Sequence, residues 1–164
     1  MTGSKILSAG LVTLALATAA APAAAQYAMV SPFRALAGSW SGGGTISMAN
    51  GEREQLRCRA NYSPGGGGEE LSLNLRCASA SYNFDLSSNV RDRGGAISGE
   101  WTEASRNASG TLSGRASGDH IEAAAQGQNF SANLSLTTRG NRQSITLNPS
   151  GGEVRAVTLA LSRR

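Results

Sequence analysis

The sequence predicts an all-β fold, an antiparallel up-and-down meander of about 8–10 strands that closes into a small barrel. From residue 40 onward, apolar and polar residues alternate with a period of two in short segments. Clusters of Gly, Asn, Asp and Pro separate these segments, and no long apolar stripe at helical spacing occurs. The length is that of one ordinary domain, so one core is expected.

The first 25 residues have the pattern of a cleavable signal peptide. Lys5 precedes an apolar stretch, and Ala23 and Ala25 stand where a signal peptidase requires small side chains. The stretch is too short and too rich in Ala for a membrane span, which needs about 20 strongly apolar residues. We therefore expect residues 26–164 to form one mature domain without a transmembrane span, located in the periplasm or secreted.

The first predicted hairpin turns around Gly51. One face of its first strand carries Trp40, Gly42, Gly44, Ile46 and Met48. One face of its second strand carries Leu56, Cys58, Ala60 and Tyr62. A turn centred on Gly51 places Ile46 opposite Leu56 and Trp40 opposite Tyr62, so the apolar faces of the two strands match.

The third strand predicts the disulfide. A register that pairs Tyr62 with Leu73 places Cys58 directly opposite Cys77, and facing residues of an antiparallel pair are close enough for a disulfide. These are the only cysteines of the chain, and export would take them to an oxidising compartment. The same register places Arg59 opposite Arg76 on the other face.

Further period-two segments follow to the end of the chain. Their apolar faces begin at Tyr82, Ile97, Leu112, Ile121, Phe130, Ile145 and Val154. A reversal over residues 126–129 predicts Ala125 opposite Phe130 and Ile121 opposite Leu134. The two-residue turn Gly140-Asn141 predicts Leu136 opposite Ile145. Closing the meander removes its exposed edges, and its polar outward positions are the reverse of an outer-membrane barrel.

The segment from Phe33 to Gly44 resembles the start of the calycin group, the lipocalin, avidin and nitrobindin-like barrels. In those barrels a short helical turn precedes a Gly-x-Trp motif, here Gly38-Ser39-Trp40, at the first strand. The resemblance implies an up-and-down barrel with Trp40 packed across its closed end. Gly99-Glu100-Trp101 repeats the pattern, as a second end plug or by chance.

In nitrobindin-like barrels a histidine ligates haem, so the resemblance raises the question of a haem ligand in this chain. The only histidine of this chain, His120, alternates with the apolar face of its strand and is expected to point outward. The cysteines are committed to a disulfide and one histidine makes no ligand cluster, so no metal site and no cofactor are predicted.

No catalytic arrangement stands out. Asp119 and His120 are adjacent in sequence, so they face opposite sides of one strand and cannot act together. Glu100 and Glu103, like Glu69 and Glu70, are expected to be solvated charges. Residues 65–68 lack the Lys-Ser/Thr of a phosphate loop. The sequence therefore predicts a protein that is not an enzyme.

Two candidate sites remain. The predicted interior holds five aromatic residues among small ones, and this leaves either room for a small apolar ligand or a fully packed barrel. The aromatic residues are Trp40, Tyr62, Phe84, Trp101 and Phe130. Outside, Arg57, Arg59 and Arg76 form either a site for an anionic envelope component, such as lipopolysaccharide, an acidic polysaccharide or an acidic protein surface, or a solvated patch.

The sequence favours an exported, non-enzymatic binding protein that takes an apolar ligand in the barrel or an anionic partner on its arginine face. No feature predicts nucleic-acid binding. The alternative is an envelope inhibitor of a protease or lysozyme, which requires a protruding loop; residues 65–70 and 91–95 are the candidates. An envelope enzyme has the least support.

Overall fold

The computed structural model describes residues 31–164, so the predicted signal peptide lies outside the described residues. A short 3-10 helix, η1 (Arg34–Leu36), precedes ten strands. The strands are β1 (Gly38–Met48), β2 (Arg53–Gly65), β3 (Glu70–Ala78), β4 (Asn83–Arg93), β5 (Ala96–Glu103), β6 (Ala108–Ser117), β7 (His120–Gly127), β8 (Phe130–Arg139), β9 (Arg142–Ser150) and β10 (Val154–Arg163). A second 3-10 turn, η2 (Gly66–Gly68), joins β2 to β3.

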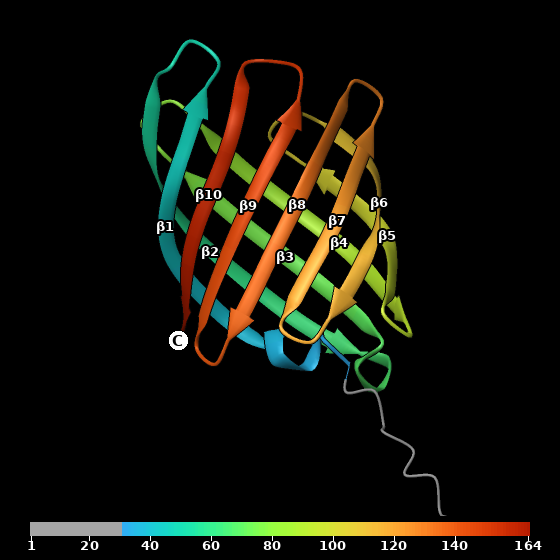
Figure 1. Cartoon of the computed structure of the whole chain (residues 1–164). Coiled ribbons are helices and arrows are strands. Elements are labelled where there is room, and N and C mark those ends of the chain that lie inside the picture. The colour runs from blue at the N-terminus through green and yellow to red at the C-terminus, as the bar shows by residue number, and fades with distance from the viewer. Residues whose placement is uncertain (1–30) are drawn as a thin grey trace, which may run out of the picture.

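Each strand pairs antiparallel with the next, and β10 pairs with β1 to close the barrel (Figure 1). The predicted all-β closed meander is confirmed. We call the end with η1, η2 and the chain terminus the capped end, and the opposite end, with the β1–β2, β3–β4, β5–β6, β7–β8 and β9–β10 turns, the open end (Figure 1). No helix within residues 31–164 is long and apolar enough to cross a membrane.

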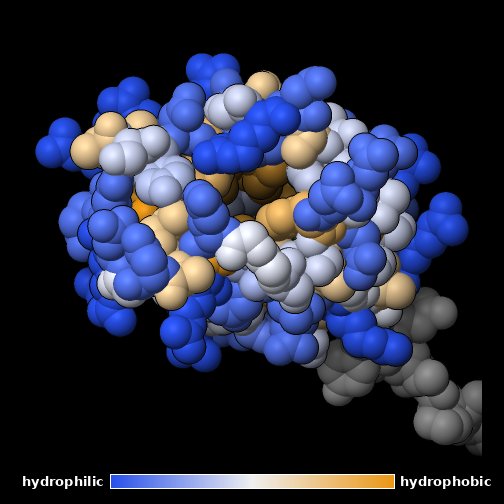
Figure 2. All heavy atoms as spheres, turned by 90° about the horizontal axis from the view of Figure 1, so that it is seen from above, coloured by the Kyte–Doolittle hydropathy of each residue, from blue (hydrophilic) through white to orange (hydrophobic). Residues whose placement is uncertain are grey.

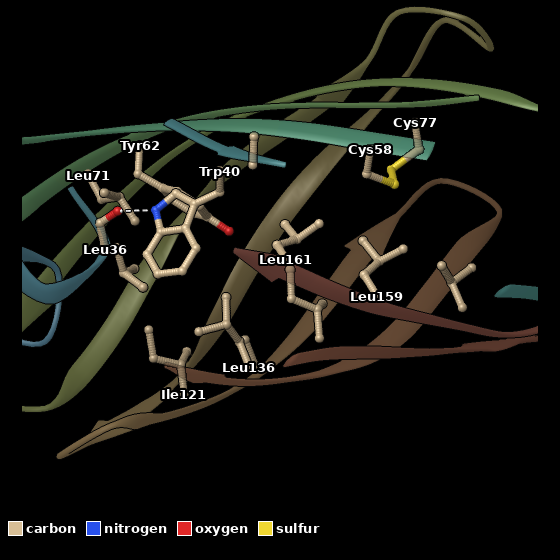
Figure 3. Close-up of a cluster of buried hydrophobic side chains, with 14 of the residues drawn as sticks. Leu36, Trp40, Cys58, Tyr62, Leu71, Cys77, Ile121, Leu136, Leu159 and Leu161 are labelled. Carbon is tan, nitrogen blue, oxygen red and sulfur yellow. Dashed lines mark hydrogen bonds between the residues drawn. A yellow bond between two sulfur atoms is a disulfide. The ribbon is translucent and has the colours of Figure 1, made fainter. Parts of the chain in front are cut away.

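The disulfide register is confirmed. Tyr62 pairs with Leu73, and Cys58 pairs with Cys77, to which it is covalently bonded. Both cysteines point into the barrel and are buried (Figure 3). The bond therefore ties β2 to β3 from the inside.

Two predicted hairpin registers are wrong by two residues. Ile46 pairs with Glu54 and Trp40 with Ala60, because Gly51 closes the turn by donating its N–H to the Met48 carbonyl instead of standing at its centre. The prediction of which residues face inward is still correct, because a register shift of two residues leaves every side chain on the same face of the sheet.

The β7–β8 hairpin shows the same kind of shift. Ala125 pairs with Ala132 and Ile121 with Leu136, whereas Phe130 pairs with Gly127. The turn is therefore the tight two-residue type favoured in hairpins, over residues 128–129, instead of the predicted four-residue reversal. The Leu136–Ile145 pair across the β8–β9 turn is confirmed.

Glycines on the inward face let neighbouring strands approach closely. A Cβ at Gly44 would lie 1.9 Å from the carbonyl oxygen of Thr158, and one at Gly110 would lie 1.8 Å from that of Gln126. Side chains are therefore excluded at these positions, where the wall bends.

Candidate ligand site in the barrel lumen

Trp40 forms the floor of the barrel at the capped end. Its side chain is 1% exposed, and its indole N–H donates to the Leu36 carbonyl of η1 at 2.7 Å (Figure 3). The Arg163 guanidinium lies 4.6 Å from the centre of the indole ring and donates to the carbonyls of Ala35 and Ala37. Residues from both ends of the described chain thus seal this end around one tryptophan.

Sequence reasoning missed Arg163. Its position in β10 gave no signal, since the chain ends in two arginines, Arg163 and Arg164. Only the closure of β10 onto β1 brings Arg163 opposite Trp40.

A buried polar chain lies beside this floor. Tyr62, packed edge-to-face on Trp40 with ring centres 6.5 Å apart, donates its hydroxyl to Gln143 Oε1 at 2.8 Å. Gln143 Nε2 donates to Thr138 at 3.2 Å. Burial raises the pKa of the Tyr62 phenol far above its ordinary value, and the hydrogen bond to Gln143 offsets this only in part. The phenol is therefore a neutral, fixed part of the floor.

A second aromatic group lies toward the open end. The rings of Trp101 and Phe130 meet edge-to-face at 5.5 Å, and the Trp101 N–H donates to the Thr111 carbonyl at 3.1 Å. A Cβ at Gly110 would lie 2.8 Å from Trp101 Cζ2, so the indole rests against a wall with no side chain there. Trp101 therefore lines this wall of the barrel.

Phe84 also lies toward the open end, at the start of β4, with the Arg106 guanidinium 4.8 Å from its ring centre. The five aromatic residues predicted as one ligand-binding set thus fall into two groups. Trp40 and Tyr62 make the floor, whereas Phe84, Trp101 and Phe130 lie near the opposite end.

Between these groups the interior is incompletely filled. Several leucines whose register points them inward remain partly exposed, namely Leu73, Leu75, Leu86, Leu112, Leu134 and Leu147. Leu73 pairs with the inward Tyr62, and Leu134 pairs with both Ala123 and Leu147. Seen from the open end, the barrel is hollowed and apolar side chains line the recess (Figure 2). The exposure of these leucines is therefore to the lumen.

The carboxylates buried on the inward side serve the turns. Glu103 was predicted to be solvated, but it is buried and accepts hydrogen bonds from the backbone N–H groups of Asp85, Ser105 and Arg106. Burial disfavours its charged form, yet these bonds outweigh burial and lower the pKa of Glu103. Asp92 likewise accepts from the N–H of Gly95 at 2.8 Å.

On the outer surface, Arg59 lies opposite Arg76 as predicted. Asp85 is directly opposite Arg76, and the two side chains form an ion pair at 3.1 Å. Within residues 31–164, Arg57 and Arg59 make no ion pair. The three predicted arginines are thus together, but one of them is neutralised.

His120 lies on the outer surface, as expected. Its ring nitrogens are 2.9 Å from Thr137 Oγ1 and 3.3 Å from Glu122 Oε1, both on outward positions of the sheet. The imidazole therefore does not reach the lumen.

The two segments considered as inhibitory loops do not protrude freely. The β2–β3 connection is held against η1, since Arg34 donates to the Gly67 carbonyl at 3.0 Å and Ser31 donates to that of Gly68. In the second segment, β4 continues to Arg93 and only Gly94 and Gly95 form the turn.

The closed antiparallel meander fits a calycin-like barrel. No protein-family model matches the sequence, and no curated protein matches it either. Solved structures do share the fold. Rv2717c from M. tuberculosis superposes with a TM-score of 0.64 at 15% identity, covering 79% of this chain and 93% of its own.

The S-type phycobiliprotein lyase CPES from Guillardia theta superposes with a TM-score of 0.60 at 9% identity, covering 80% of this chain and 89% of its own. At such identities the likeness concerns the fold alone.

Proposed function

We propose that this chain is a non-enzymatic binding protein that holds one small, uncharged, apolar molecule in the lumen of its barrel. The observation that carries the proposal is the partial exposure of inward leucines in the middle of the strands. Strands surround them on all sides, and Trp40 seals the floor. Protein interiors are normally close-packed, so a hollow lined by leucine is a site for an apolar guest.

The chemistry of the wall selects an uncharged ligand. Glu103 and Asp92 are occupied by backbone N–H groups, and Ser88 donates its hydroxyl to the Glu100 carbonyl at 2.8 Å. A charged group brought among the leucines would lose its hydration without gaining a partner. Apolar surface gains about 25 cal/mol for each Å² removed from water.

The open end is the route of entry, because the capped end is closed by η1, Trp40 and Arg163. A phycobiliprotein lyase among proteins of the same fold supports a barrel that receives a small molecule. The disulfide supports the proposed export to the periplasm or the outside of the cell, since disulfides persist in oxidising compartments.

The test is binding of N-phenyl-1-naphthylamine, a neutral apolar dye that fluoresces when it leaves water. We expect saturable enhancement with one dye per chain. Leu134→Trp fills the lumen from β8 and should abolish this signal, whereas Asn133→Trp, its outward neighbour, should retain it. Equal binding by both variants, or no enhancement with the wild-type chain, would refute the lumen site.

A further inference from the structure

Strands β10, β1 and β2 make a continuous part of the barrel wall with an unusual outer face. The outward positions of β1 and β10 carry small side chains, including Ser41, Gly43, Thr45, Thr158, Ala160 and Ser162. Beside them, β2 presents three exposed arginines, Arg53, Arg57 and Arg59. This face is thus smooth and is bordered by guanidinium groups.

No acid on these strands neutralises the arginines. The only carboxylate within β10, β1 and β2 is Glu54. It lies toward the open end, where it accepts hydrogen bonds from the Ser79 hydroxyl at 2.6 Å and the Ser81 N–H at 3.1 Å. The positive charge of the face is therefore uncompensated by its own strands.

A fourth arginine is held over the small side chains of this face. Arg164 Nε donates to Ser41 Oγ at 2.5 Å, and Ser41 lies directly opposite Arg59. Arg59 in turn lies opposite Arg76. Like charges placed opposite each other on a sheet are destabilising. Asp85 compensates Arg76 only, so within residues 31–164 the charges of Arg57 and Arg59 stay available to an anion.

We propose that the arginine track, defined as Arg53, Arg57, Arg59 and Arg164, binds an extended chain of an acidic polysaccharide. Arg59 lies six positions after Arg53 along the strand, a reach of about 20 Å. Guanidinium forks match carboxylate and sulfate groups in pairs of hydrogen bonds. The small residues beside them let a flat chain of sugars lie against the sheet.

The same face lacks the groups that other polyanions require. None of the outward residues of β1, β2 and β10 is aromatic or a large aliphatic side chain. Docking to a membrane surface relies on such side chains entering the bilayer, and binding of single-stranded nucleic acid relies on aromatic rings that stack on bases. A hydrophilic, linear, acidic partner is the class that remains.

The experiment uses the complete mature chain and a polygalacturonate oligosaccharide, with its neutral methyl ester as the matched probe. We expect polygalacturonate to bind and the ester not to bind. Arg57→Gln with Arg59→Gln should weaken binding about tenfold, as loss of two charge-assisted contacts implies. The control, Arg93→Gln with Arg115→Gln, removes the same charge from β4 and β6, away from the track, and should leave affinity nearly unchanged.

Equal weakening by the two double variants would show attraction by net charge only and overturn the proposal. So would equal binding of the methyl ester, or binding of an acidic protein but not of polygalacturonate. Arg57→Lys with Arg59→Lys keeps the charge and the fold but not the fork, and should lose an intermediate part of the affinity. Thermal unfolding of each variant checks that the barrel is intact.

Discussion

At the scale of single residues, the floor of the barrel depends on side chains that close off their own polar groups. Trp40 donates to Leu36, and Tyr62 donates to Gln143 across 81 positions of sequence. A buried donor without a partner costs about 1 to 3 kcal/mol, so these two bonds allow polar aromatic residues to seal an apolar lumen.

Tyr62 is expected to make the folded protein less stable as the pH rises into the alkaline range. Because its pKa is raised in the folded state, its contribution is complete below the ordinary tyrosine pKa of about 10 and is lost as pH rises above that value. Each further pH unit should lower the free energy of unfolding by up to about 1.4 kcal/mol from this group. Urea unfolding at pH 8 and pH 11 measures the slope, and Tyr62→Phe should flatten it. An unchanged slope in Tyr62→Phe would contradict the role of this phenol.

At the scale of strands and turns, the sequence predicts faces better than pairs. Alternation assigned Ile46, Leu56 and Cys58 correctly to the interior, yet the β1–β2 register shifted by two. Alternation cannot distinguish registers that differ by two, because the same faces remain matched. The disulfide register was predictable because covalent geometry admits only a facing pair.

The inward acids and the hollow were not predictable in the same way. Glu103 follows the inward alternation of Trp101, but its partners are backbone N–H groups set by the conformation of the β5–β6 turn. The two aromatic groups lie at opposite ends because strands tilt and stagger around a barrel, and this stagger is a property of the closed sheet.

Gly110 tests how the wall of β6 and β7 shapes the site. Gly110→Ala places a methyl group against the Gln126 carbonyl and the Trp101 ring, so we expect a loss of about 1 to 3 kcal/mol in the free energy of unfolding. The wavelength of Trp101 fluorescence should shift as the ring leaves the wall. Placing Trp40→Phe in the background of both the Gly110 protein and the Gly110→Ala variant makes Trp101 the only tryptophan that is observed. Ser109→Ala, the outward neighbour, is the control. Equal stability of the two variants would contradict the close strand approach.

At the scale of the whole molecule, closure of ten strands places a polar surface outside and an apolar hollow inside. One end is sealed by residues from both ends of the described chain, and the other is open between hairpin turns. The barrel interior can therefore be reached from the open end. The lumen and the arginine track lie on opposite sides of the wall, so we expect the proposed apolar ligand and the proposed polysaccharide to bind independently.

The position of a bound apolar molecule tests the account most directly. Methyl NMR of the protein saturated with N-phenyl-1-naphthylamine measures nuclear Overhauser contacts between dye and side chains. We predict contacts to the inward methyl groups of Leu73, Leu112 and Leu134 and none to the outward methyl groups of Ala124 and Ala160. Contacts confined to the outward alanines, with the leucine signals unmoved, would contradict a ligand site in the lumen.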